Sequence, residues 1–296
     1  MKPFLFTLIA LCLALPAEAQ TAGPAEFLQT YVWKVDHPQF GGFSGLELTE
    51  DGRELVTLSD RTSLWRATIT RDASGKITAV SPSANPLTLH DNHDRPMTVS
   101  RGDSEGLALA PDGGVYVSFE GDLPRIDYYA KGSSKAVPLP RAAEFRHLQA
   151  NASLEALAID GRGALYTLPE RSGRSGRPFP VFKLADNRWS RPFSIAREGE
   201  WQAVGADFGP DGRFYLLERD FWGLLGFLTR VEVFEVRDGK LGQGQVLLQT
   251  TAGHHDNLEG LSVWRDTEGF IRLTMISDDN FRMLQRTEIV EYRLPK

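Results

Sequence analysis

A two-strand pattern recurs five times along this chain. Its clearest copy begins at Ser104, where the run Glu-Gly-Leu-Ala-Leu-Ala leads into Pro-Asp-Gly and then into an alternating apolar run that ends at Glu120. Asp-Gly between two apolar runs predicts a β-hairpin, because glycine readily adopts the positive φ that such turns need. The equivalent positions of the five copies are Gly45, Gly106, Ala156, Gly205 and Gly260, so the repeat is about 50 to 60 residues long.

An all-strand repeat of about 40–50 residues or slightly more is typical of β-propeller blades. We therefore predict an all-β protein, a β-propeller with five blades. A sixth blade would need about 40 residues without the motif, and residues 61–103 could hold either that blade or two outer strands and a loop. Residues 26–35 predict a strand before the first copy, whereas one strand, about 286–293, remains after the last. Pairing these two terminal segments would close the ring and remove an exposed edge.

The first 19 residues have the pattern of a signal peptide. Lys2 precedes a short apolar core, and Ala17-Glu18-Ala19 supplies small residues for cleavage before Gln20. We expect export to the periplasm or secretion, with residues 20–296 forming one domain; an uncleaved membrane anchor is the alternative. The lone cysteine, Cys12, lies in this segment, so the mature chain would have no disulfide bond.

The formal net charge of −6 argues against some classes of partner. Nucleic acids attract basic proteins, and anionic membranes attract polybasic segments, neither of which this balance favours. We expect a monomer that binds a small molecule and, once residues 1–19 are removed, no membrane.

Three glutamates occupy the same place in their repeats, directly before the inner strand: Glu105, Glu155 and Glu259. Inner strands line the channel of a propeller, so these side chains would converge at one end of it. Converging carboxylates repel one another unless protons or cations compensate. Carboxylate oxygens from several strands suit calcium, so we predict a calcium site at the channel mouth. Alternatively, each glutamate accepts backbone N–H bonds or pairs with an arginine.

The second strand of each repeat also ends in charged residues, which are Asp60-Arg61, Glu120, Glu170-Arg171, Glu218-Arg219-Asp220 and Asp278-Asp279. Arginine binds phosphate and carboxylate groups in bidentate fashion. Arg61, Arg171, Arg219 and the loop residue Arg101 are therefore candidates for binding an anionic substrate. The alternative, which a repeat-wide feature favours, is that these charges pair with one another between blades.

His254, His255 and Asp256 stand directly before the last inner strand and have no counterpart in the other repeats. Function tends to be added to a scaffold at such unique positions, and a histidine beside carboxylates can carry protons near neutral pH. These three residues are our candidate general acid and base. The alternative is a solvated loop.

Several enzyme signatures are missing from the sequence. It contains no Gly-x-Ser-x-Gly elbow, no His-Glu-x-x-His motif and no phosphate-binding glycine loop. These absences exclude an α/β-hydrolase.

The Glu-Gly-Leu-Ala sequence within residues 104–108, its variants at Glu155 and Glu259, and the Ser-Asp-Asp-Asn-Phe run at 277–281 resemble the phytase-like family, described as having esterase-like activity of phytase. The resemblance implies an exported propeller and calcium-assisted hydrolysis of a phosphoester. A phytate site would need many lysines and arginines, whereas the inner-strand positions here are mainly acidic. A smaller ester or phosphoester is the substrate that this departure favours.

Two functional hypotheses follow. In the first, calcium held by Glu105, Glu155 and Glu259 assists hydrolysis of an ester, while His254 or His255 moves protons. In the second, the propeller binds a ligand or a protein without catalysis, and its acidic ring holds the blades together. A lactonase-like enzyme is a further alternative, because the sequence does not distinguish phosphomonoester, carboxyl ester and lactone.

Overall fold

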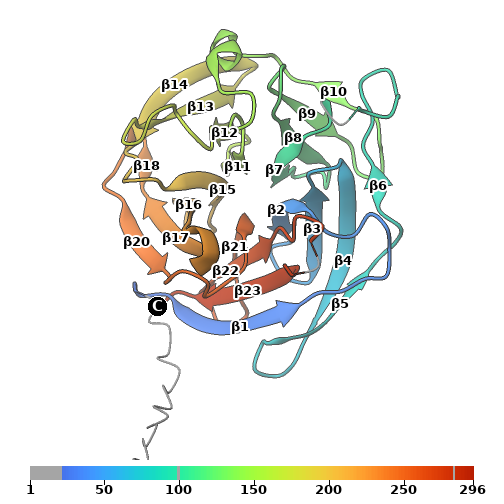
Figure 1. The fold of residues 1–296 in the computed structure, drawn as a ribbon, viewed down its shortest axis with the longest axis vertical. Helices are drawn as coiled ribbons and strands as arrows, with labels where there is room; N and C mark the ends of the chain where they lie inside the picture. Colours follow the sequence, from blue (N-terminus) through green and yellow to red (C-terminus); the bar gives the residue numbers. More distant parts are fainter. Residues whose placement is uncertain (1–21, 99–100, 283) are drawn as a thin grey trace, which may run out of the picture.

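The computed structural model describes residues 22–98, 101–282 and 284–296. The predicted signal peptide, residues 1–19, lies outside the described residues. Five antiparallel sheets stand around a central axis (Figure 1), which confirms the predicted five-bladed β-propeller. From the axis outward the blades consist of β2 (Phe43–Leu48), β3 (Glu54–Ser59), β4 (Ser63–Arg71) and β5 (Ile77–Pro82) in blade 1; β7 (Ser104–Leu109), β8 (Val115–Phe119), β9 (Arg125–Tyr129) and β10 (Val137–Pro138) in blade 2; β11 (Ala156–Ile159), β12 (Leu165–Leu168), β13 (Phe179–Ala185) and β14 (Arg188–Ile195) in blade 3; β15 (Gln202–Phe208), β16 (Phe214–Phe221), β17 (Phe227–Phe234) and β20 (Gln245–Gln249) in blade 4; and β21 (Leu258–Arg265), β22 (Ile271–Ser277), β23 (Glu288–Arg293) and β1 (Glu26–Val32) in blade 5.

The N-terminal strand closes the ring as predicted. β1 pairs antiparallel with β23, and Glu26 stands opposite Arg293 in this register. The Arg293 guanidinium also lies 2.8 Å from the Glu26 carboxylate. Pairing the two ends of the described chain in one sheet leaves blade 5 as complete as the others.

The stretch that left a sixth blade open belongs to blade 1. Residues 61–103 supply β4, β5 and the short strand β6 (Leu87–Thr88), which pairs with β4. The remaining small elements are the hairpin of β18 (Val236–Arg237) and β19 (Lys240–Leu241) and the 3₁₀ helices η2 (Ala143–His147) and η3 (Gly223–Leu225). No helix in the described part of the chain is long and apolar enough to cross a membrane.

The hydrophobic core lies between the blades. Separate buried clusters fill the boundaries of neighbouring sheets; one, for example, joins Leu107 and Val117 of blade 2 to Leu58 of blade 1. Other clusters fill the boundaries between blades 2 and 3, 3 and 4, 4 and 5, and 5 and 1. Because each blade buries both of its faces, its strands show long buried runs, such as the eight-residue strand β21, buried at every position but its last.

Glycines allow the inner strands to approach closely. A Cβ atom on Gly106 would lie 2.5 Å from the carbonyl oxygen of Glu155, and one on Gly205 would lie 2.5 Å from that of Glu259. The space remaining on the axis is about 10 Å³, too little for a water molecule to enter. A ligand can therefore bind only over the ends of the channel.

Candidate functional site

Carboxylates gather at the end of the channel where the inner strands begin and the second strands end. The inner strands β7, β11 and β21 are preceded or begun by acidic residues, and β8, β12 and β22 are followed by them. A β-bulge near the start of β7 and of β21 interrupts the regular pairing there. The acidic residues at this end include Asp103, Glu105, Glu120, Glu155, Glu170, Glu259 and Asp278.

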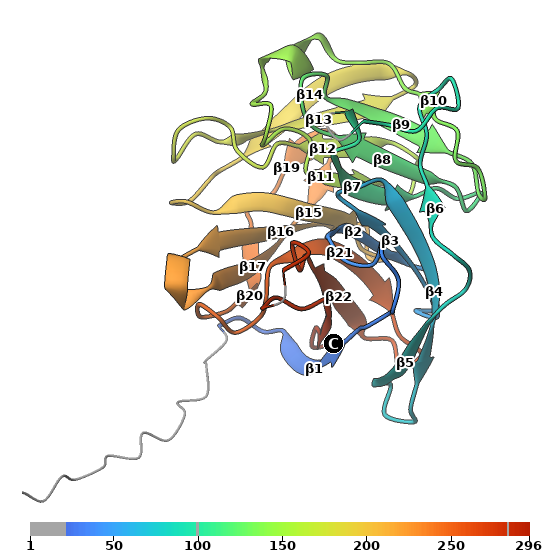
Figure 2. The same ribbon diagram turned by 45° about the vertical axis from the view of Figure 1, so that its right-hand side comes forward.

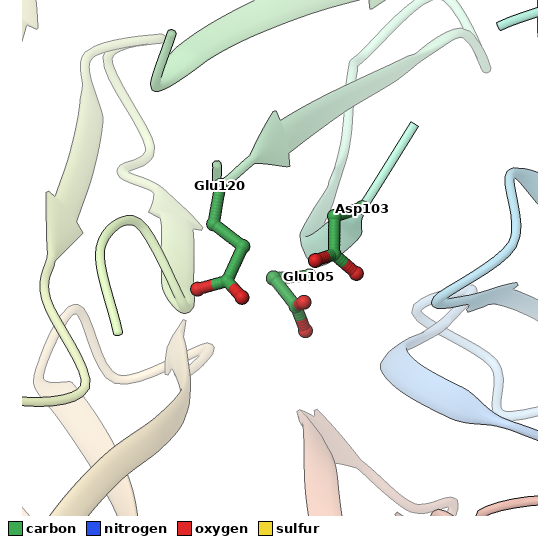
Figure 3. A group of neighbouring side chains, drawn as sticks. All are labelled: Asp103, Glu105 and Glu120. Carbon is green, nitrogen blue, oxygen red and sulfur yellow. The ribbon is translucent and has the colours of Figure 1, made fainter. Parts of the chain in front are cut away.

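Three of these residues form a compact cluster. Asp103, Glu105 and Glu120 each offer a carboxylate oxygen, and these oxygens lie within 4.8 Å of one another (Figure 3). Glu105 and Glu120 are buried. Asp103 is held beside Glu120 by the backbone, because its carbonyl oxygen accepts the Glu120 N–H at 3.0 Å.

Burial and mutual repulsion raise the pKa values of this group. Burial, followed by the charges of Glu120, Glu259 and Asp103, raises the pKa of Glu105 well above its usual range. Burial and the charge of Glu105 do the same to the pKa of Glu155. Burial and Asp103 raise the pKa of Glu120 to about 7. Near neutral pH these groups therefore keep protons that a bound cation would displace.

The other half of the mouth already contains a cation. The Arg219 Nη2 atom lies 2.9 Å from a Glu170 carboxylate oxygen, and Nη1 pairs with Glu259. Asn257 donates to the same oxygen of Glu259 at 2.9 Å. Burial raises the pKa of Glu259, and the Arg219 charge opposes that rise.

The four carboxylates Asp103, Glu105, Glu120 and Glu155 lack such a partner. Within the described ranges, no lysine, arginine or histidine forms an ion pair with any of them. Hard, closely spaced oxygen donors without a compensating charge fit the ligand preference of Ca²⁺. Two of the predicted metal ligands, Glu105 and Glu155, lie in this half, whereas Glu259 is bound to Arg219.

Sequence reasoning placed no metal ligand at Asp103 or Glu120. The signal for Glu120 was the acid that ends each second strand, which we interpreted mainly as one member of an inter-blade ion pair. In the fold, Ser104 stands opposite Phe119 across the β7–β8 ladder. The residues beside that pair, Asp103 and Glu120, are therefore neighbours.

The two candidate histidines have different surroundings. His255 is buried, its Nε2 atom lies 2.7 Å from the Tyr292 hydroxyl, and its ring lies 6.1 Å from that of Phe27. Burial and the nearby His254 lower the pKa of His255 to about 3, so its ring is neutral near pH 7. His254 is only half-buried and lines a pocket; burial lowers its pKa too.

The third candidate proton carrier, Asp256, is engaged by the backbone. Its carboxylate accepts the backbone N–H of Arg286 at 2.8 Å and the side-chain amide of Gln285 at 3.1 Å. These contacts tie the loop before β21 to the segment before β23. Asp256 also lines the pocket that contains His254.

The four candidate arginines are spread over the mouth and its rim. Arg171 and Arg219 line the same pocket as His254. The Arg61 guanidinium stacks over Phe281, 3.6 Å from the ring centroid, and Arg101 lines a smaller pocket of about 400 Å³. The structure thus brings two of the four together.

That shared pocket is large, at about 1630 Å³, and it opens on the acidic end of blades 3 to 5. Its polar lining includes Arg171, Arg219, His254 and Asn257, and an apolar part is formed by the turn between β16 and β17. Arg219 and Asn257 both contact Glu259. The floor of the pocket therefore borders the cluster of carboxylates.

A second pair of carboxyl groups is buried near the opposite end of the inner strands. Glu47 of β2 accepts a hydrogen bond from the Ser262 hydroxyl at 3.3 Å, and Asp207 of β15 accepts the Val263 N–H at 2.6 Å. Burial raises the pKa of Asp207 to about 7, and burial together with the Asp207 charge raises the pKa of Glu47 well above its usual range. These groups are well suited to staying protonated inside the fold.

Residues 38–281 match the phytase-like family, whose description is esterase-like activity of phytase. The chain belongs to this family. The match covers most of the chain, including all five inner strands, and it confirms the resemblance drawn from the strand motifs. No curated protein matches the chain.

Solved structures with similar folds are propellers of other activities. The α-L-arabinofuranosidase of Podospora anserina superposes with a TM-score of 0.53 at 11% identity, covering 92% of this chain and 98% of that one. The aldose sugar dehydrogenase of Streptomyces coelicolor superposes with a TM-score of 0.50 at 12% identity, covering 93% and 100%. At such identities the likeness shows the fold alone.

Proposed function

We propose that this protein is an exported, calcium-assisted hydrolase that acts on a phosphoester or carboxyl ester at the acidic mouth of the propeller. Membership of the phytase-like family supports ester hydrolysis. The observation that carries the proposal is the half-mouth of Asp103, Glu105, Glu120 and Glu155, which has no cation partner among the described residues and borders a large pocket.

The four carboxylates would hold the ion through their oxygens. When bound, calcium supplies positive charge that polarises an ester or phosphoryl oxygen and lowers the pKa of a water molecule. Arg219 has a supporting role, because its pairs with Glu170 and Glu259 confine the uncompensated charge to the other side of the mouth.

The remaining steps fall to residues of the pocket. The exposed Arg171 guanidinium would bind and orient a phosphate or carboxylate group of the substrate. His254 is the half-buried histidine of the pocket, and its pKa below the usual value leaves it neutral and able to accept a proton at pH 7. His255, held against Tyr292, would fix the loop that carries His254.

Hydrolysis of para-nitrophenyl phosphate, para-nitrophenyl acetate and a simple lactone tests the proposal. We expect turnover of at least one substrate with calcium, loss of that turnover after chelation, and loss in Glu105→Gln. Glu144→Gln, which changes an exposed glutamate of η2, is the matched control and should keep full turnover. The absence of turnover of all three substrates with calcium would contradict the proposal and favour a non-catalytic binding propeller.

A further inference from the structure

The turn between β16 and β17 presents an unusual group of apolar side chains to solvent. Phe221, Trp222, Leu224 and Leu225 are 58%, 55%, 107% and 65% exposed. Figure 2 shows this turn, with η3 at its tip, projecting from the face of the ring. Four large apolar side chains gathered on one turn form the kind of exposed patch that marks a binding site.

This turn is part of the large pocket at the mouth. Phe221, Leu224 and Phe227 line it, and Leu284 of the segment before β23 adds another exposed apolar side chain. The rings of Phe221 and Phe227 lie 4.7 Å apart. We call Phe221, Leu224, Phe227 and Leu284 the apolar wall.

The apolar wall continues directly into the polar part of the pocket. The Arg219 guanidinium lies 6.0 Å from the centroid of the Phe227 ring, and the same guanidinium pairs with Glu170 and Glu259. One molecule bound in the pocket can therefore contact the wall and the channel mouth at once.

The pocket also offers positive charge for an anionic group. Arg171, Arg282 and Arg286 line it and are exposed at their side chains. Arg171 pairs loosely with Glu170 at 3.4 Å. Because these guanidinium groups remain open to solvent, they can bind a phosphate or carboxylate without first breaking a buried ion pair.

We propose that the pocket selects esters that are both anionic and apolar, with the anionic group on the arginines and an alkyl or aryl group against the apolar wall. This inference rests on the proposed function and names its substrate class. A fully polar polyphosphate would leave the wall in water, whereas an alkyl or aryl group would bury part of it at a gain proportional to the covered area. The net charge of −6 disfavours an anionic membrane as the occupant of the turn.

The test measures binding instead of turnover. Inorganic phosphate and n-alkyl phosphates from butyl to octyl are titrated into the protein by calorimetry, in the presence of a chelator. We expect affinity to rise about twofold to fourfold per methylene group added, as partial to full burial of each group predicts. Phe221→Ser combined with Leu224→Ser should remove most of this dependence on chain length.

Two further variants separate the contributions. Leu123→Ser changes a comparably exposed leucine in the loop before β9 and should leave the chain-length dependence intact. Arg282→Gln should weaken all the alkyl phosphates by a similar factor, because it removes charge without changing the wall.

Two results would overturn the inference: affinity that does not depend on chain length, or the same dependence in the double serine variant as in the wild type. If phosphatidylcholine vesicles bind the wild type but not the double variant, and chain length has no effect, the turn is a membrane contact and the inference is wrong. Because binding is measured without calcium, the inference can hold even if no ester is hydrolysed, and it can fail while hydrolysis is confirmed.

Discussion

The Arg219 Nη2 atom lies 2.9 Å from a carboxylate oxygen of Glu170, across the boundary between blades 4 and 3. The same guanidinium pairs with Glu259 of blade 5. One arginine thus joins three blades and divides the acidic mouth into a compensated half and an uncompensated half. This division decides which carboxylates are available to a metal ion.

Removing this cation should strongly destabilise the protein. Arg219→Ala leaves Glu170 and Glu259 buried without a partner, and breaking a buried ion pair in this way costs about 3–5 kcal/mol. Unfolding in urea at pH 7 with a chelator present measures the loss. Arg188→Ala, at an exposed arginine of β14, is the control and should change the free energy of unfolding by less than about 0.5 kcal/mol. A loss below about 1 kcal/mol for Arg219→Ala would show that Arg219 does not hold the blades together.

The two adjacent histidines should behave differently on substitution. His255→Ala removes a buried ring and its contact with Tyr292, so we expect a loss of about 2–4 kcal/mol in the free energy of unfolding. His254→Ala should leave thermal stability nearly unchanged and lower turnover by about 100-fold or more, as expected for a proton carrier. Full turnover in His254→Ala would remove it from the mechanism.

The buried pair Glu47 and Asp207 should make stability depend on pH. The raised pKa of Asp207, about 7, means that the folded protein keeps a proton which the unfolded chain releases near pH 4. Over that interval the unfolded state binds fewer protons, so the free energy of unfolding falls as the pH rises from about 4 to 7. Above pH 7 this contribution no longer changes.

Asp207→Asn isolates this effect. An asparagine oxygen can still accept the Val263 N–H but carries no charge, so the variant should be more stable than the wild type at pH 8 by more than about 1 kcal/mol. The advantage should shrink toward pH 4. The exposed turn residue Asp238 provides the matched control, Asp238→Asn. Equal stability of Asp207→Asn and wild type at pH 8 would contradict the raised pKa.

At the mouth, calcium should reverse a similar pH effect. Burial raises the pKa of Glu120 to about 7 and that of Asp278 to about 8, so without metal these groups also lower stability as the pH rises from about 4 to 8. Bound calcium requires ionised carboxylates, so its stabilisation grows with pH. Melting temperatures at pH 5 and pH 8, with calcium and with chelator, check this. A calcium-induced shift as large at pH 5 as at pH 8 would exclude these groups as the binding site.

The sequence was sufficient to predict the five blades and the closing strand, because these depend on patterns that every repeat contains. The hairpin motif around Gly106 and its copies determined the number of blades, and the unpaired segments at the two ends predicted the β1–β23 pairing. Both are properties of local alternation and turn chemistry.

The composition of the site depends on contacts between blades, which repeat equivalence does not predict. Glu105 and Glu259 occupy equivalent positions, but Arg219 reaches only Glu259, and Glu105 meets Glu120 instead. Likewise, His254 and His255 are adjacent in sequence, yet one lines a pocket and the other is buried against Tyr292. Which neighbour a side chain meets is decided by the curvature of the ring.

Calorimetric titration of the purified protein with Ca²⁺ at pH 7.5 tests the central claim most directly. We predict one Ca²⁺ bound per chain, no binding in Glu105→Gln or Glu120→Gln, and unchanged binding in Glu144→Gln. Circular dichroism of each variant would confirm that the propeller is folded. Absence of calcium binding in the wild type, or undiminished binding in folded Glu105→Gln and Glu120→Gln, would contradict a calcium site at the channel mouth.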